Sequence, residues 1–73
     1  MTFSLSQSVA AEVRAEMARQ SKTQADLGRV LGVVQPAISL RLRGKRPFKL
    51  DELERLADYF DVPLSSLIRG RVA

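Results

Sequence analysis

The sequence has no cysteine and no histidine among its 73 residues, and it has only three prolines and four glycines. Without cysteine the chain has no disulfide, no thiolate nucleophile and no cysteine-type zinc site. Without histidine it lacks the commonest general base and a frequent metal ligand. We therefore expect a protein that is not an enzyme and that binds no metal and no cofactor.

The chain also lacks a long hydrophobic run. No apolar stretch approaches the roughly 20 residues that span a bilayer, and no signal peptide opens the sequence. Hydrophobic residues make up 45% of the chain, which is normal for a globular fold and too much for a disordered tail. We expect one domain over residues 1–73, with a core at about 5–69, a frayed C-terminal tail, and a cytoplasmic location away from membranes.

Positive charge is concentrated in one stretch of the chain. There are 12 Lys and Arg against 8 Asp and Glu, a net charge of +4. Residues 35–49 hold five cations and no acid, whereas residues 50–61 hold five acids and one cation. The five cations are Arg41, Arg43, Lys45, Arg46 and Lys49. This density indicates a polyanionic partner, most simply nucleic acid. The alternative is a solvated basic surface.

Helical periodicity is common in the sequence, and strand signals are weak. Apolar spacing predicts five helices, at about 5–20, between Thr23 and Gly32, and at about 35–43, 50–60 and 64–69. Two helix starts have the spacing of a capping box, Ser4 with Gln7 and Thr23 with Asp26. Gly32 stands where a left-handed C-cap is needed.

Each predicted helix has an apolar and a polar face. The expected core residues are Val9, Ala10, Val13, Met17, Leu27, Val30, Leu31, Ile38, Leu42, Leu50, Leu53, Leu56, Ala57, Phe60, Leu64, Leu67 and Ile68. Five acids are expected on solvated faces and not in a metal or acid–base site, namely Glu12, Glu16, Asp51, Glu54 and Asp58. Gly28 lies inside a helix, where glycine destabilises the fold by about 0.5–1 kcal/mol relative to alanine. We therefore expect the next helix to approach closely at this position.

The segment TQADLGRVLGVVQPAIS, residues 23–39, resembles the helix-turn-helix of Cro- and repressor-type regulators of phages and bacteria. Gln24 opens the first helix of the pair, Gly28 follows four residues later, Gly32 makes the turn, and Ile38 anchors the second helix. The likeness extends over about residues 9–68. It implies an all-α, compact five-helix lambda-repressor-like domain.

The resemblance further implies a sequence-specific, Cro-like transcriptional regulator that binds double-stranded DNA, with residues 35–43 as the recognition helix in the major groove. Residues expected to contact bases are Gln35, Pro36, Ser39, Leu40 and Arg43. Residues expected to contact phosphates are Thr23, Gln24, Arg41, Lys45, Arg46 and Lys49. Gln35 suits adenine, whose N6 and N7 pair with an amide, and Leu40 suits a thymine methyl group.

Four positions depart from the pattern of this family. Val34 stands where many relatives carry a Ser or Thr N-cap for the recognition helix. Met17 and Leu42 stand where many relatives pair an Arg with a Glu, and we expect an apolar contact in place of that ion pair. Arg41 lies where relatives often bury a large apolar residue, so it falls at the boundary between the inner and outer faces of this helix.

Relatives of this kind usually bind DNA as two-fold dimers. We expect this protein to bind no membrane and no small-molecule ligand. A small dimer patch, or alternatively the closure of the core, is expected from Leu64, Leu67, Ile68 and Val72. The alternative function is a protein-interaction module, such as an antitoxin-type adaptor, because one fold serves several functions. The cation run beside the recognition helix favours DNA.

Overall fold

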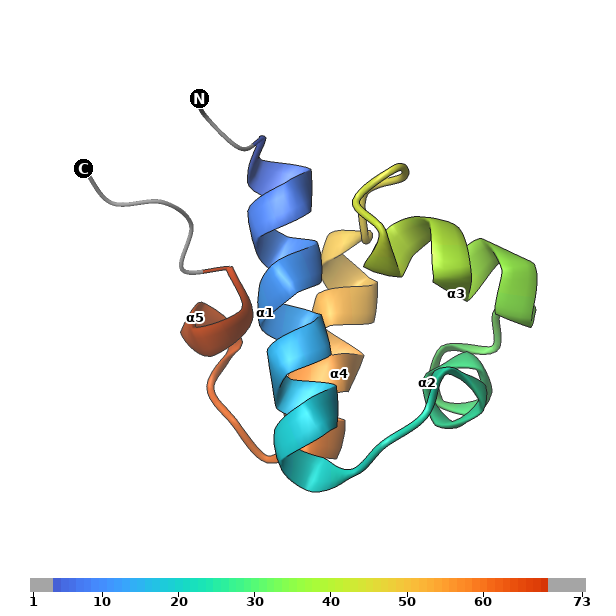
Figure 1. The fold of residues 1–73 in the computed structure, drawn as a ribbon. Helices are drawn as coiled ribbons and strands as arrows, with labels where there is room; N and C mark the ends of the chain where they lie inside the picture. Colours follow the sequence, from blue (N-terminus) through green and yellow to red (C-terminus); the bar gives the residue numbers. More distant parts are fainter. Residues whose placement is uncertain (1–3, 69–73) are drawn as a thin grey trace.

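The computed structural model describes residues 4–68, which form five α-helices and no strand (Figure 1). They are α1 (Leu5–Gln20), α2 (Gln24–Leu31), α3 (Gln35–Leu42), α4 (Leu50–Phe60) and α5 (Leu64–Leu67). The predicted all-α five-helix domain is confirmed. Helix α3 ends one residue before the predicted Arg43, and α5 ends at Leu67. Arg69 and the tail 70–73 lie outside the described residues, within which no helix is long and apolar enough to cross a membrane.

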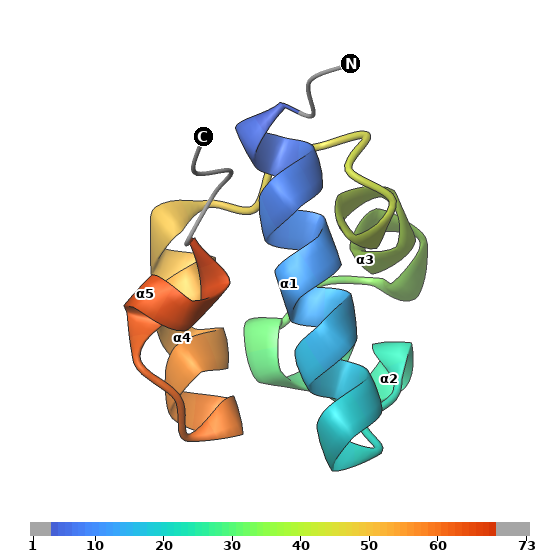
Figure 2. The ribbon, with the colours of Figure 1, turned by 60° about the vertical axis from the view of Figure 1, so that its left-hand side comes forward.

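Helix α1 runs through the middle of the view in Figure 2, with α4 and α5 on one side, α3 on the other and α2 passing behind it. Helix α2 packs against both α3 and α4. All five helices contribute to one apolar core, which contains Val9, Val13, Leu27, Leu31, Ile38, Leu42, Leu53, Leu56, Ala57, Phe60 and Leu67. Met17, Val30 and Leu64 are partly buried against it. The helix-spaced apolar residues therefore form the core that the sequence predicts.

Two expected core residues are exceptions. Ile68 is 39% exposed at the end of α5, and Leu50 is 63% exposed although its spacing places it on the core face of α4. It is the first residue of that helix, and the helix reaches the core only with Leu53. Leu67 is 1% exposed and closes the core, and Leu64 is partly buried, so only Ile68 of the expected dimer patch is exposed within the described residues. Val72 lies outside them.

The ends of the helices have the caps that the sequence indicates. Ser4 with Gln7 and Thr23 with Asp26 each form both hydrogen bonds of a capping box. Gly32 adopts the left-handed conformation, with φ of 66°, at the end of α2. Val34, the N-cap residue of α3, makes no side-chain cap hydrogen bond, as its missing hydroxyl predicts.

Gly28 allows the close approach that was expected, but the closest group belongs to the turn. A Cβ atom at this position would lie 2.9 Å from the carbonyl oxygen of Val33 and 3.8 Å from Cγ1 of Ile38. The turn carbonyl is therefore the tighter of the two neighbours, and the following helix is the second. A side chain here would push the turn away from α2.

Glu16 corrects another expectation, because its side chain is buried and not solvated. Its carboxylate accepts hydrogen bonds from Arg19 at 2.6 and 3.0 Å and from the Gln20 amide at 2.8 Å. The Arg19 hydrogen bonds, followed by that of Gln20, lower the pKa of Glu16. Gln20 also donates to the Phe60 carbonyl, so this group ties the end of α1 to the end of α4.

Gly44 packs its backbone directly onto the first turn of α1. A Cβ atom there would lie 2.9 Å from Cγ and 3.2 Å from Cα of Gln7, and the φ angle is +73°. Gly32 has a similar φ of +66° but no atom within 4 Å of the same position. A side chain would therefore strain the backbone at both positions, and only at Gly44 would it also meet a packed neighbour.

Alanine substitutions at the two glycines separate these effects. We expect Gly32→Ala to lower the free energy of unfolding by about 1–2 kcal/mol, the strain of a left-handed alanine. We expect Gly44→Ala to lower it by at least about 1 kcal/mol more, because Gln7 must also move. Urea denaturation measures both. Equal losses would show that the contact between Gly44 and Gln7 is not close.

Candidate nucleic-acid interface

The helix-turn-helix consists of α2, the turn 32–34 and α3. The Val33 amide donates to the Gly28 carbonyl at 3.0 Å, and the Ala37 and Ile38 amides donate to the Val34 carbonyl at 3.0 and 3.1 Å. The turn is therefore hydrogen-bonded to the helix on either side. A shallow hollow between the helices is lined by Ala25, Gly28, Arg29, Gly32, Val33, Val34 and Gln35.

The outer face of α3 carries the residues expected to contact bases. Gln35, Pro36 and Arg43 are exposed, and Ser39 and Leu40 are half-buried. Ile38 and Leu42 point into the core on the opposite side of the helix. Four of these residues are thus accessible on α3 and Arg43 directly follows it, and their contacts with bases stay predictions.

The basic loop, residues 43–49, follows the C-terminal end of α3. Its four cations, Arg43, Lys45, Arg46 and Lys49, are all exposed. The Lys45 amide donates to the Leu40 carbonyl at 3.0 Å, and the Gly44 amide donates to the Arg41 carbonyl at 3.1 Å. The start of the basic loop is therefore fixed to α3, and Gly44 fixes it to α1.

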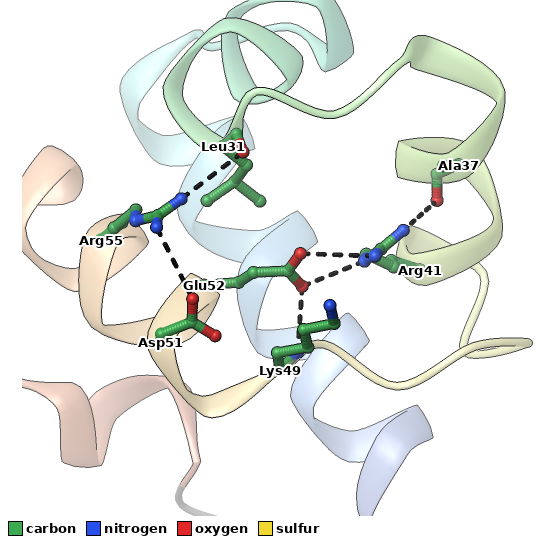
Figure 3. A network of polar contacts seen from close by, with 7 residues as sticks. All are labelled: Leu31, Ala37, Arg41, Lys49, Asp51, Glu52 and Arg55. Atoms are coloured by element: carbon green, nitrogen blue, oxygen red, sulfur yellow. Dashed lines mark hydrogen bonds and ion pairs between the residues drawn. The ribbon is translucent and has the colours of Figure 1, made fainter.

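Arg41 differs from the other residues expected to contact phosphates, because it is only 8% exposed. Its Nε and Nη2 atoms donate to the two carboxylate oxygens of Glu52 at 3.0 and 3.3 Å, and its Nη1 donates to the Ala37 carbonyl at 3.2 Å (Figure 3). A guanidinium committed to an interior carboxylate is not free for phosphate, so the prediction that Arg41 contacts a phosphate is not supported by its position. Sequence analysis missed Glu52. The signal available was that a charged residue stood at a position that relatives bury, since a buried charge needs a partner.

The N-terminus of α2 holds the other two residues expected at phosphates. Thr23 is exposed and Gln24 is half-buried, beside free helix amides that favour an anion. Asp26 accepts from the Thr23 amide at 2.8 Å and is ion-paired with Arg29. The hydrogen bond from the Thr23 backbone, followed by that of the Thr23 hydroxyl, lowers the pKa of Asp26.

This pKa makes the stability of the N-terminus of α2 depend on pH. The lowered pKa shows that the folded state favours the ionised form of Asp26. Its contribution to stability is therefore present above the ordinary pKa of 3.8 and is lost as the pH falls through the lower pKa of the folded state. We expect Asp26→Asn to destabilise the protein at pH 7 and to have a shrinking effect below about pH 4. Thermal unfolding across this range measures the difference. A difference that grows on acidification would contradict the assignment.

The C-terminal end of α3 is also held from α1. Arg14 donates from Nη1 to the Leu42 carbonyl, so this arginine is the α1 residue whose side chain reaches the end of α3. Met17 is partly buried against the core to which Leu42 belongs. The expected direct contact of Met17 with Leu42 stays a prediction.

The outer face of α4 is acidic. Asp51, Glu54 and Asp58 are exposed there, as the sequence predicts. Among the described residues, no group of acids is arranged to hold a metal ion. The acidic face belongs to α4, where Asp51 is ion-paired with Arg55, whereas the basic loop presents four exposed cations and no acid.

The second helix of this helix-turn-helix has an accessible polar face, and a run of exposed cations follows it. These features are typical of the class of helix-turn-helix regulators. The sequence model of the helix-turn-helix family matches residues 13–67, which is most of the chain, and the chain belongs to this family. This is a family of DNA-binding transcription regulators. No curated protein sequence matches the chain.

Three solved structures share the fold. The clp gene regulator ClgR from Corynebacterium glutamicum superposes with a TM-score of 0.86 at 16% identity, over 94% of this chain and 73% of that one. The hypothetical transcription factor NHTF from Neisseria gives 0.80 at 21% identity, over 92% and 77%. The restriction-modification controller protein C.AhdI from Aeromonas hydrophila gives 0.75 at 19% identity, over 85% and 94%. At these identities the similarity establishes the fold.

Proposed function

We propose that this protein is a sequence-specific, Cro-like transcriptional regulator that places α3 in the major groove of double-stranded DNA. The observation that carries the proposal is the pairing of two neighbouring surfaces. The accessible face of α3 carries Gln35 and Ser39, and the adjoining basic loop presents four exposed cations without an acid. The family of the chain supports the same function.

Base recognition is assigned to the outer face of α3. The Gln35 amide can both accept from and donate to adenine N6 and N7, and Arg43 can donate to guanine O6 and N7. Leu40 supplies an apolar contact for a thymine methyl group, and Ser39 can donate or accept. Pro36 has no amide hydrogen, so it contributes shape only.

Phosphate contacts are assigned to two groups of residues at the edges of α3. Lys45, Arg46 and Lys49 of the basic loop attract one strand, and Thr23 and Gln24 present the N-terminus of α2 to another phosphate. These contacts position the helix and carry no sequence information themselves. Affinity for any duplex should therefore come mainly from the loop.

Titration of a random duplex at two salt concentrations tests this function. Each phosphate contact should contribute about −0.9 to the slope of log K against log salt. Three or more contacts from the basic loop therefore predict a slope steeper than about −2.5. Absence of binding at low salt, or binding indifferent to salt, would favour the protein-interaction module.

Two substitutions separate base contacts from phosphate contacts. We expect Gln35→Ala to weaken binding to a duplex selected from a random pool by about 1–3 kcal/mol and to leave random duplexes unaffected. We expect Lys45→Ala to weaken all duplexes alike and to reduce the salt slope by about one unit. Arg55→Gln, which removes a cation from α4, is the control and should change neither. Equal losses for both variants on every duplex would contradict the assignment.

The proposal includes a two-fold dimer on DNA, formed through an apolar groove at the start of α1 and α4. The groove is lined by Leu5, Ser6, Val9, Pro47, Phe48, Leu50, Leu53 and Ile68. Three of these apolar side chains, Leu5, Leu50 and Ile68, are exposed, and a two-fold axis would bury the same groove of both copies.

Leu50→Glu tests the dimer without disturbing the core, because Leu50 is exposed. Sedimentation on a two-half-site duplex should show two copies bound cooperatively for the wild type. For the variant we expect stepwise binding of single copies, because a charge would have to be buried in the interface. A wild type that binds one copy at a time would contradict the dimer.

A further inference from the structure

The carboxylate of Glu52 lies where α3, α4 and the end of the basic loop meet (Figure 3). Its two oxygens accept from Nε and Nη2 of Arg41 on α3. One of them also accepts from the backbone amide of Lys49 at 2.9 Å. A single side chain on α4 is therefore bonded both to the recognition helix and to the last residue of the basic loop.

This connection is buried. The side chains of Arg41 and Glu52 are 10% and 7% exposed. Backbone packing places α3 against α1 and α2, so the ion pair is the polar link from α3 across to α4. A bidentate pair of a guanidinium and a carboxylate fixes both the distance and the angle between its elements. Apolar packing alone is not directional in this way.

Stability alone is a weak reason for such a pair. Replacing a buried ion pair by apolar side chains of similar volume is often neutral or stabilising. Arg41 also gives no exposed charge to the interface, since Glu52 cancels its charge in the interior. What the pair does provide is one fixed orientation of α3 relative to the basic loop.

We propose that Glu52 and Arg41 are positioning residues that determine sequence specificity. They hold the outer face of α3 and the cations of the basic loop in a single arrangement, so that base contacts and phosphate contacts form together on the correct sequence. Neither residue touches DNA. This inference rests on the proposed function, because it concerns how the same interface discriminates between sequences.

The main test is the double variant Arg41→Met/Glu52→Leu, which replaces the pair and leaves the net charge unchanged. Binding is measured to the selected duplex and to a random duplex over a range of salt. We expect the variant to fold, to keep the salt slope, and to bind the random duplex within about twofold of the wild type. We expect its preference for the selected duplex to fall at least about tenfold, because α3 is no longer bonded through Glu52 to α4 and to the end of the basic loop.

The matched control is Asp51→Asn/Arg55→Gln, which removes the exposed pair on the same helix, 3.6 Å apart, again at constant net charge. It also removes the long hydrogen bond, 3.5 Å, from Arg55 to the Leu31 carbonyl, which does not involve α3 or the basic loop. It should keep the wild-type preference and slope. Arg41→Lys is the second variant and keeps the charge but loses the bidentate fork. It should show a preference between those of the wild type and the double variant, even if the double variant folds poorly.

Three other outcomes would each contradict the proposal in a different way. A double variant and an Arg41→Lys variant that both keep the wild-type preference within twofold would show that the pair is only structural. A double variant whose salt slope falls by about one unit would show that Arg41 contacts a phosphate instead. Wild-type protein that binds duplex without any sequence preference would refute the specific regulator itself and, with it, this inference.

Discussion

A buried carboxylate that accepts from an arginine and a backbone amide is the interaction on which the geometry of this interface depends. Removing one partner of such a pair leaves an uncompensated charge in the interior and costs about 3–5 kcal/mol. Glu52 and Arg41 therefore depend on each other, because the loss of either side chain leaves the other as an unpaired buried charge. Gly44 adds a second constraint, because its lack of a side chain lets the basic loop lie against Gln7. Helix α3 and the basic loop that follows it are positioned from α1 and α4 together.

Charge is divided between roles in this small domain. Arg41 is neutralised inside the fold, and the exposed cations of the basic loop are left to attract a polyanion. Three acids of α4, Asp51, Glu54 and Asp58, are exposed on its outer face. The fourth, Glu52, is buried in the interior. Non-specific attraction would then come from the loop and discrimination from α3, which are the two terms that make up specific DNA binding.

Local signals in the sequence predicted most of the fold. Capping boxes at Ser4 and Thr23 and the left-handed Gly32 depend on neighbouring residues, so their spacing was sufficient. Burial of Glu16 and exposure of Leu50 depend on where other helices lie, and periodicity within one helix contains no such information. The partnership of Arg41 with Glu52 spans two helices for the same reason. At the interface, the accessible residues of α3 and the basic loop could be predicted from the sequence. The carboxylate of Glu52, which is bonded to both, could not.

Amide chemical shifts of the labelled protein during titration with the selected duplex test the central claim most directly. If Glu52 holds α3 and the basic loop as one unit, amides from 35 to 49 should respond together along a single binding curve. Amides around Glu54 and Asp58 should stay unchanged. A response confined to the loop, with α3 unaffected, would contradict the account, and so would a response confined to Leu5 and Ile68 of the dimer groove.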